Sequence, residues 1–223
     1  MLEIVKTGDG SNTIYNTHVG ENYHSKHGAL QESRHVFVNS GLSYFLDRDE
    51  NTDVSILEVG FGTGLNFLLS ADFCIDKEIK LKYTGVEAYP LSLEMISQTG
   101  YDQYVSAGLW QKFTSFYQDA LFSPIQLNTN CQLQIAKAKL LDYKSDKQYD
   151  IIYFDAFASI RQPEMWDETA ISHTIQFLKP GGVFVTYAIT GNLKRALKAL
   201  GCKVEKAPGA PGKREMLRAV KMV

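Results

Sequence analysis

The stretch LEVGFGTGLNFLL at residues 57–69 constrains the fold more than any other part of the chain. Its three glycines stand at every second position between two apolar runs. Residues 54–59 have the composition of a buried strand, and residues 64–73 have that of a helix. Glycine permits the tight turn and the close ligand contact that such a junction requires. The order strand, glycine turn, helix predicts an open α/β sheet with a ligand at the carboxyl ends of its strands.

Strands and helices alternate along the rest of the chain. We predict strands at 81–88, 131–138, 149–157 and 183–188, and helices from residue 90, at 167–182 with a terminal Pro-Gly-Gly turn, and at 191–201. The last helix gathers apolar residues on one face: Leu193, Ala196, Leu197 and Leu200. The PGAPG stretch at 208–212 predicts a hairpin, whereas residues 100–130 match no clear pattern. The expected fold is α/β and Rossmann-like, with a mostly parallel twisted sheet and an antiparallel C-terminal hairpin.

Composition narrows the class of protein. A chain of 223 residues with 44% hydrophobic content can bury one substantial core. Its three cysteines, Cys74, Cys131 and Cys202, are far apart, which argues against a zinc ribbon or a disulfide scaffold and favours a reducing compartment. The N-terminus has no signal-peptide pattern, and no apolar run is long enough to span a membrane. We therefore expect a soluble cytoplasmic protein.

The glycine spacing indicates which ligand the loop holds. Gly60, Gly62 and Gly64 give G-x-G-x-G, with Leu65 where a dinucleotide fingerprint needs its third glycine, and no Lys-Ser/Thr pair follows. Glu58 precedes the first glycine by two residues, and its charge would repel a pyrophosphate. The same charge suits a cation, such as the amino group of S-adenosylmethionine. The loop therefore predicts a ligand without phosphate.

Other strand ends carry acids as well. Glu87 ends the second strand, where a carboxylate can accept both ribose hydroxyls, and Asp155 ends the fourth strand in the sequence DAF. The sequence LKPGG precedes the fifth strand. Taken singly, Glu87 could merely cap the next helix and Asp155 could tether a loop. Together with the glycine loop, these features resemble the class I S-adenosylmethionine-dependent methyltransferases.

Several longer stretches narrow the resemblance. They are the glycine loop with Phe61, Asn66 and Phe67, FDAFASIRQPEMW at 154–166, GKREML at 212–217 and YHSKHGALQESRHVF at 23–37. These are similar to the methyltransferase half of the bifunctional tRNA 5-methylaminomethyl-2-thiouridine biosynthesis proteins and to its stand-alone homologues. The similarity covers nearly the whole chain and lacks the flavin-binding oxidoreductase half, so we expect the stand-alone form.

Two positions depart from the family pattern. Ser159 stands where the family has a proline, which predicts a less rigid loop on the substrate side. The third strand leads into Ala136, Lys137 and Ala138 instead of a Gly-Asp pair that meets the adenine, with Asp142 farther on. The residue that contacts the adenine therefore stays open.

The resemblance implies transfer of a methyl group from S-adenosylmethionine to the amine of 5-aminomethyl-2-thiouridine at the tRNA wobble position. Asp155 is the expected catalytic residue, which orients the amine and accepts its proton. Phe157 and Trp166 are expected to stack on the base, with core packing as the alternative. Residues 1–50, with a helix near 32–45, are expected to form a flap over the cofactor, and residues 51–223 the methyltransferase domain. The expected cofactor-binding residues are Glu58, Gly60, Gly62, Thr63, Gly64, Asn66, Glu87, Tyr23 and Glu32.

Charge is unevenly distributed along the chain. Residues 194–221 hold nine basic and two acidic side chains, although the whole chain has a net charge of −2. This uneven distribution of charge indicates a nucleic-acid-binding surface, with an ordinary solvated face as the alternative. The expected tRNA contacts are Lys194, Arg195, Lys213 and Arg214. His24 and His27 lack a nearby third ligand, so no metal is expected. The rival functions are a small-molecule methyltransferase of the same fold and a non-catalytic RNA-binding module.

Overall fold

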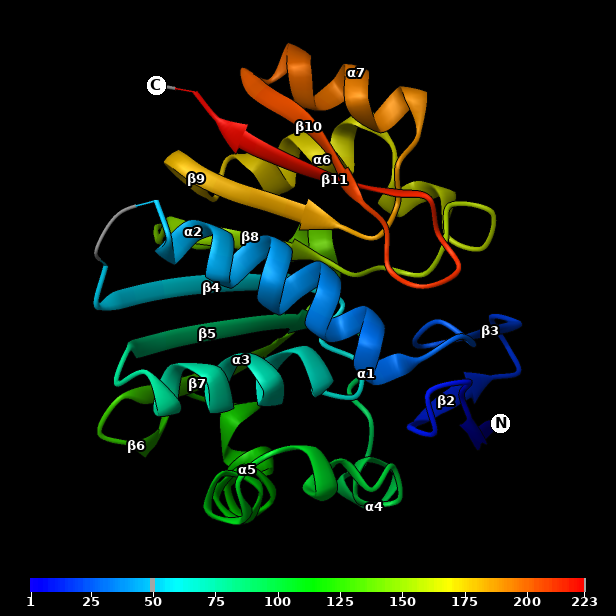
Figure 1. Cartoon of the computed structure of the whole chain (residues 1–223), viewed down its shortest axis with the longest axis vertical. Helices are drawn as coiled ribbons and strands as arrows, with labels where there is room; N and C mark the ends of the chain where they lie inside the picture. Colours follow the sequence, from blue (N-terminus) through cyan, green and yellow to red (C-terminus); the bar gives the residue numbers. More distant parts are fainter. Residues whose placement is uncertain (49–50, 223) are drawn as a thin grey trace.

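The computed structural model describes residues 1–48 and 51–222. Eight strands form one sheet in the order β10-β11-β9-β8-β4-β5-β7-β6 (Figure 1). The five central strands run parallel: β4 (Asp53–Val59), β5 (Lys80–Glu87), β7 (Cys131–Lys137), β8 (Tyr149–Phe154) and β9 (Leu178–Thr186). The edge strands are antiparallel to their neighbours: β6 (Ile125–Asn128), β10 (Cys202–Pro208) and β11 (Glu215–Lys221). The predicted fold and its C-terminal hairpin are confirmed.

Helices cover both faces of this sheet. One face carries α3 (Leu65–Asp76) and a continuous helical run made of α1 (Ala29–Glu32), the π-helical stretch η1 (Ser33–Ser43) and α2 (Tyr44–Leu46). The other face carries α6 (Glu168–Ile175) and α7 (Gly191–Ala199), which pack on each other. Because strand side chains alternate between faces, Ile56 belongs to the core under α3, whereas Leu57 and Val59 belong to the core under α6 and α7.

Some predicted boundaries are wrong. The helix expected at 167–182 ends at Ile175, because the following residues enter the sheet: the Tyr149 amide donates a 2.7 Å hydrogen bond to the Phe177 carbonyl, and Leu178 begins β9. The helix expected from residue 90 begins later, as α4 (Leu93–Ser97), where the Ser92 hydroxyl accepts a hydrogen bond from the Met95 amide.

The stretch at 100–130 has regular structure that we did not predict. It contains η2 (Tyr101–Tyr104), α5 (Ala107–Ala120) and β6. Helix α5 buries Leu109, Phe113, Tyr117 and Ala120, which recur at helical spacing. The periodic pattern was therefore present in the sequence, although it was hidden among further, partly buried aromatic residues such as Trp110 and Phe116.

The N-terminal residues form a separate small sheet. It consists of β1 (Leu2–Lys6), β2 (Asn12–Asn16) and β3 (Glu21–Asn22), all antiparallel, and it lies beside the carboxyl ends of the parallel strands (blue in Figure 1). The expected boundary after residue 50 lies outside the described residues. No helix among the described residues combines the length and apolarity needed to cross a membrane.

Candidate active site

The glycine loop between β4 and α3 requires its glycines. Gly60, Gly62 and Gly64 have φ values of +87°, +51° and +78°, a region that other residues rarely adopt. A Cβ on Gly60 would collide with the carbonyl of Asp155, and a Cβ on Gly62 would lie 2.9 Å from the Tyr23 ring. The loop is thus closed on one side by the end of β8 and on another by the N-terminal segment.

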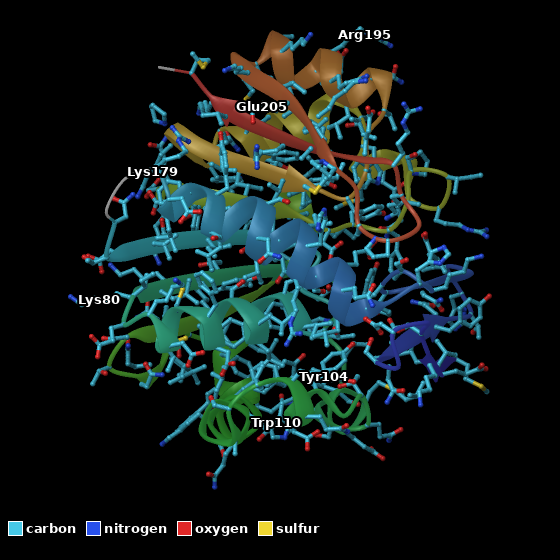
Figure 2. All side chains as sticks on the ribbon, viewed as in Figure 1. Lys80, Tyr104, Trp110, Lys179, Arg195 and Glu205 are labelled. Atoms are coloured by element: carbon cyan, nitrogen blue, oxygen red, sulfur yellow. The ribbon has the colours of Figure 1, made fainter. Side chains whose placement is uncertain are left out.

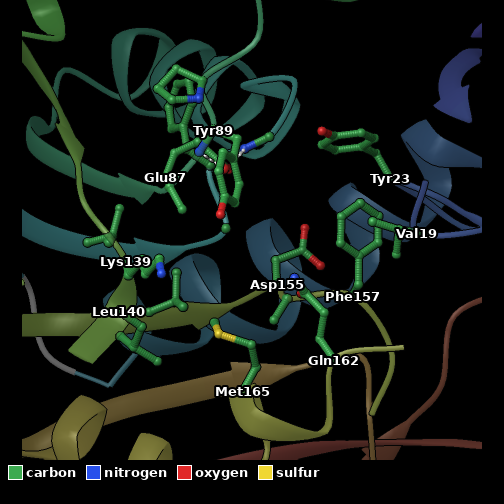
Figure 3. A pocket seen from close by; sticks show the side chains of 18 of the residues that line it. Val19, Tyr23, Glu87, Tyr89, Lys139, Leu140, Asp155, Phe157, Gln162 and Met165 are labelled. Atoms are coloured by element: carbon green, nitrogen blue, oxygen red, sulfur yellow. Dashed lines mark hydrogen bonds between the residues drawn. The ribbon is translucent and has the colours of Figure 1, made fainter. Parts of the chain in front are cut away.

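A cavity of about 1150 Å³ opens at this carboxyl edge of the sheet. It exceeds the roughly 300–1,000 Å³ usual for a small-molecule site, so it has room for a cofactor together with part of a second substrate. Its wall combines the glycine loop with the segments that follow β5, β7 and β8 and with residues of the N-terminal sheet. Figure 3 shows Asp155 facing this space, with Tyr23 and Phe157 on one side and Glu87 and Tyr89 on the other.

Asn66 joins two carboxyl groups beside the cavity. Its Nδ2 donates a 2.8 Å hydrogen bond to Glu58 Oε1 and another of 2.8 Å to Asp155 Oδ2. The Tyr83 hydroxyl donates a third, also 2.8 Å long, to the second oxygen of Glu58. Asn66 Oδ1 is buried and has no hydrogen-bond partner among the described residues, although Asn66 lines the cavity. The site therefore has an unsatisfied acceptor next to a carboxylate.

Burial makes both carboxyl groups weak acids. It raises the pKa of Asp155 to about 8, an effect that Glu32 adds to and that the Asn66 hydrogen bond and Lys213 oppose. The pKa of Glu58 is also raised, first by burial and then by the neighbouring Asp155. Asp155 can therefore exchange a proton near neutral pH, as a general base must.

Glu58 and Glu87 differ in their access to the cavity. Glu58 is fully buried beneath Asn66 and does not line the cavity, which contradicts our expectation that it contacts the cofactor directly. The strand alternation explains this, because Glu58 shares the face of Ile56 under α3. Glu87 does line the cavity, and its two oxygens accept hydrogen bonds of 3.0 Å from the amides of Gly62 and Tyr89.

Tyr23 and Thr63 line the cavity close to the glycine loop. The rings of Tyr23 and Phe157 meet edge to face with centroids 5.0 Å apart, and burial raises the pKa of Tyr23 to about 12. His24 Nδ1 lies 2.9 Å from the Thr13 hydroxyl, and burial lowers the pKa of His24 to about 4. His24 is therefore a neutral, hydrogen-bonded side chain. Among residues 1–48 and 51–222, no three potential ligands come together to hold a metal.

Trp166 lies behind the cavity. Its side chain is buried, its Nε1 donates a 2.7 Å hydrogen bond to the Phe157 carbonyl, and its ring packs edge to face on Phe154. The expectation that Trp166 stacks on the substrate base is not supported, because the indole is enclosed by protein. It instead supports the loop that presents Phe157.

Glu32 and Lys213 form an ion pair with each other. Lys213 Nζ lies 2.8 Å from Glu32 Oε2, and Glu32 Oε1 accepts a 2.9 Å hydrogen bond from the Ser25 amide. Neither side chain lines the cavity, so Glu32 does not contact a ligand there. Lys213 also lies 3.9 Å above the centre of the Tyr187 ring. Its ammonium is thus engaged by an anion and a ring of the protein itself, so Lys213 is less available to tRNA phosphates than we expected.

The other basic residues between 194 and 221 differ in their partners: Lys221 donates hydrogen bonds to the carbonyls of Ile175 and Leu178, and Lys198 forms no ion pair among the described residues. Lys203 and Arg218 pair with Glu205, and Lys206 pairs with Glu215. Within the part of the chain that the structure describes, Lys194, Arg195 and Arg214 form no ion pair. Figure 2 shows Arg195 on the outer side of α7. These three cations remain available for an anionic partner.

Sequence reasoning missed part of the cavity wall. The loop after β8 contributes Gln162 and Met165, to which we assigned no role from the sequence. The segment after β7, where the residue that contacts the adenine was left open, contributes Ala138, Lys139, Leu140 and Asp142. Placing Gln162 and Met165 requires knowledge of how the loop after β8 folds back through η4 (Pro163–Met165).

This fold and this site are those of a class I methyltransferase. The chain belongs to the family of S-adenosyl-L-methionine-dependent methyltransferases, whose pattern matches residues 102–222. The sugar N-methyltransferase KedS8 from Streptoalloteichus shares the fold, with a TM-score of 0.52 and 14% identity over 85% of this chain and 88% of that one.

More specific relatives are proteins called tRNA 5-methylaminomethyl-2-thiouridine biosynthesis bifunctional protein MnmC. That of Leptospira borgpetersenii is 31% identical over 206 residues, or 87% of this chain, and that of Magnetococcus marinus is 32% identical over 209 residues, or 89%. The chain spans about a third (31%) of the length of these curated relatives. The crystal structure of MnmC2 from Aquifex aeolicus has a TM-score of 0.77 and 22% identity, over 98% of this chain and 70% of that one.

Proposed function

We propose that this protein methylates the primary amine of 5-aminomethyl-2-thiouridine at the wobble position of tRNA, with S-adenosylmethionine as the methyl donor. The name of the MnmC relatives supports the substrate. The observation that carries the proposal is Asp155, a carboxyl group with a pKa of about 8 that faces the cavity beside the glycine loop. In this proposal tRNA is the partner, and the enzyme works in the cytoplasm, where tRNA is used.

The polar groups of the cavity suit a positively charged cofactor. The unsatisfied oxygen of Asn66 is an acceptor for the ammonium group of the cofactor, whereas a pyrophosphate would be repelled by that oxygen and by the carboxyl groups beside it. In this proposal Asn66, Thr63 and the three glycines hold the methionine part of the cofactor. Glu87 accepts the ribose hydroxyls, Tyr23 closes over the loop, and the segment after β7 receives the adenine. The N-terminal sheet acts as the cover, and the helical run 29–46 packs on the sheet of the methyltransferase domain.

S-adenosylmethionine supplies an electrophilic methyl group on a sulfonium, so the protein mainly has to align and deprotonate the acceptor. An alkyl amine is largely protonated at neutral pH and cannot attack in that form. The Asp155 carboxylate takes one proton from the acceptor ammonium, which frees the nitrogen lone pair. A pKa of about 8 lies close to working pH, where general-base catalysis is efficient. Phe157, at the cavity wall, packs against the base that carries the amine.

The test is methylation of tRNA that carries the unmethylated aminomethyl group. The purified chain is incubated with methyl-labelled S-adenosylmethionine and such tRNA, which is then digested to nucleosides. We expect label in 5-methylaminomethyl-2-thiouridine. The matched control is the same tRNA without the aminomethyl group, which should take up no label. Label in both tRNAs, or in neither, would contradict the proposal.

A further inference from the structure

The ion pair between Lys213 and Glu32 joins the two ends of the chain. Lys213 lies in the loop between β10 and β11, Glu32 lies at the end of α1, and 181 residues separate them. Their side chains are only 33% and 7% exposed. The ammonium of Lys213 is half-buried and already paired with a buried carboxylate, which points to a role within the protein.

The same lysine is connected to the loop that carries Asp155. Its ammonium lies 3.9 Å above the centre of the Tyr187 ring, and the Tyr187 hydroxyl donates a 2.8 Å hydrogen bond to the carbonyl of Ala156. The strand end that precedes the loop of Lys213 also contacts the helical run 29–46, because Nε2 of His35 lies 2.7 Å from the carbonyl oxygen of Pro208. Lys213 therefore links α1, the end of β9 and the loop after β8.

Asp155 is surrounded by titratable groups, of which Glu32 and Lys213 carry opposite charges. Two of these groups lie on strands: Glu58 on β4 and Tyr83 on β5. The other three are Glu32 on α1, Tyr187 at the end of β9 and Lys213 in the loop between β10 and β11. Lys213 is the one cation of these five. Glu32 raises the pKa of Asp155 and Lys213 lowers it. The charge state of Asp155 thus depends on an ion pair that does not line the cavity.

We propose that Lys213 is a positioning residue for methyl transfer: its ammonium, held by Glu32 and the Tyr187 ring, fixes the Asp155 loop and lets Asp155 lose its proton among buried carboxylates. The proposal rests on the proposed role of Asp155 as the base. Lys213, the lysine of the GKREML stretch, then supports Asp155 and does not bind RNA.

Two variants that remove opposite charges from the ion pair test this role. Lys213→Met keeps the apolar stem and removes the cation, and it should raise the midpoint of the acid limb of kcat by about one pH unit, with roughly tenfold slower turnover at neutral pH. Glu32→Gln removes the anion and should lower the same midpoint. The double variant should return close to the wild-type profile. Lys213→Arg, which keeps the charge, should retain the wild-type midpoint.

A second readout needs no tRNA. The carboxyl resonance of Asp155 in protein labelled with ¹³C at the aspartate carboxyl, assigned by its loss in Asp155→Asn, reports its titration directly. It should move in the same directions as the kcat limb. If tRNA is not methylated at all, the proposed function fails, yet this titration still decides the role of Lys213. If Lys213→Met does not fold, Glu32→Gln and Lys213→Arg carry the test.

The matched control is Lys206→Met, on the same hairpin. Its ammonium forms an exposed pair 3.3 Å from Glu215 and should leave the midpoint unchanged. Equal midpoints in the wild type, Lys213→Met and Glu32→Gln would overturn the proposal and leave a purely structural ion pair. A weaker salt dependence of tRNA binding in Lys213→Met, without a shifted midpoint, would instead make Lys213 a phosphate contact.

Discussion

The side chain of Asn66 donates a 2.8 Å hydrogen bond to the carboxylate of Asp155, across 89 residues of sequence. Asn66 lies in the first turn of α3, where the positive end of the helix dipole favours a nearby anion. Asp155 follows β8 at the adjacent strand end. This hydrogen bond connects the glycine loop to the expected base, so a substitution in the loop should also affect Asp155, and a substitution of Asp155 should affect the loop.

Asn66→Ala should destabilise the protein and weaken cofactor binding. It removes the donor shared by Glu58 and Asp155 and leaves two buried carboxyl oxygens without that partner. The unfolding free energy in urea should fall by about 1–3 kcal/mol, the usual cost of an unsatisfied buried polar group. Asn39→Ala, at an exposed position of the helical run 29–46, should stay within about 0.5 kcal/mol of wild type. Equal stability of the two variants would contradict the structural importance of the bridge.

Asp155→Asn should reduce kcat by about 10²–10⁴-fold while cofactor affinity, measured by calorimetry, changes little. The wild-type rate should rise with pH through a midpoint near 8 as the carboxylate forms, and the variant should lose this limb. Methylation at a near-normal rate by the variant across neutral pH would exclude Asp155 as the base.

The same substitution should change how stability depends on pH. The pKa of Asp155 is raised in the folded protein, so the folded state holds this proton up to about pH 8, whereas the unfolded chain loses it near pH 4. Stability from this group is full at low pH and is lost as pH rises through 8. Asp155→Asn should therefore gain thermal stability relative to wild type between pH 5 and pH 9. A constant difference in Tm over that range would show that the pKa is not raised.

The parallel strands and the glycine turn could be predicted because local patterns determine them. Residues 54–59 and 149–154 are almost continuously apolar, as strands buried on both faces are, and Asp155, which follows the second of them, falls at the sheet's carboxyl edge. Glu58 could also have been placed in the core by the alternation with Ile56, but its charge suggested a ligand. The pairing of Lys213 with Glu32 could not be predicted, since no local pattern relates residues 181 positions apart.

Gly62→Ala should weaken binding of S-adenosylmethionine. The new Cβ would lie 2.9 Å from Cδ1 of Tyr23, and the φ of +51° is strained for alanine, so both the loop and the covering ring must shift. Gly108→Ala is the control, because its Cβ meets nothing within 4 Å and it lies in α5, where alanine stabilises by about 0.5–1 kcal/mol. Calorimetry should separate the two variants. If Gly62→Ala bound S-adenosylmethionine with wild-type affinity, the glycine loop and the Tyr23 ring would not form the cofactor site.

Binding of tRNA should depend on Lys194, Arg195 and Arg214, which have no ion pair within the described part of the chain. Lys194 and Arg195 lie in α7, which follows the carboxyl end of β9, and Arg214 precedes β11, whose Leu217 pairs with Thr186 at that same end. All three therefore lie near the edge where the cavity opens. They are separate from Lys213, whose charge is taken up by Glu32.

Neutralising these three residues together, as Lys194→Gln, Arg195→Gln and Arg214→Gln, should weaken tRNA binding without changing cofactor affinity. Each phosphate that no longer meets a cation should reduce the slope of log affinity against log salt by about 0.7–0.9, because fewer counterions are released. The matched control neutralises Lys203 and Lys206, whose charges are already paired with Glu205 and Glu215, and should keep the wild-type slope. Filter binding over a salt series measures both. If the control and the triple variant show the same reduction in slope, local ion pairing does not decide which cations bind tRNA. If the slope is unchanged in both, the tRNA binds another face of the protein.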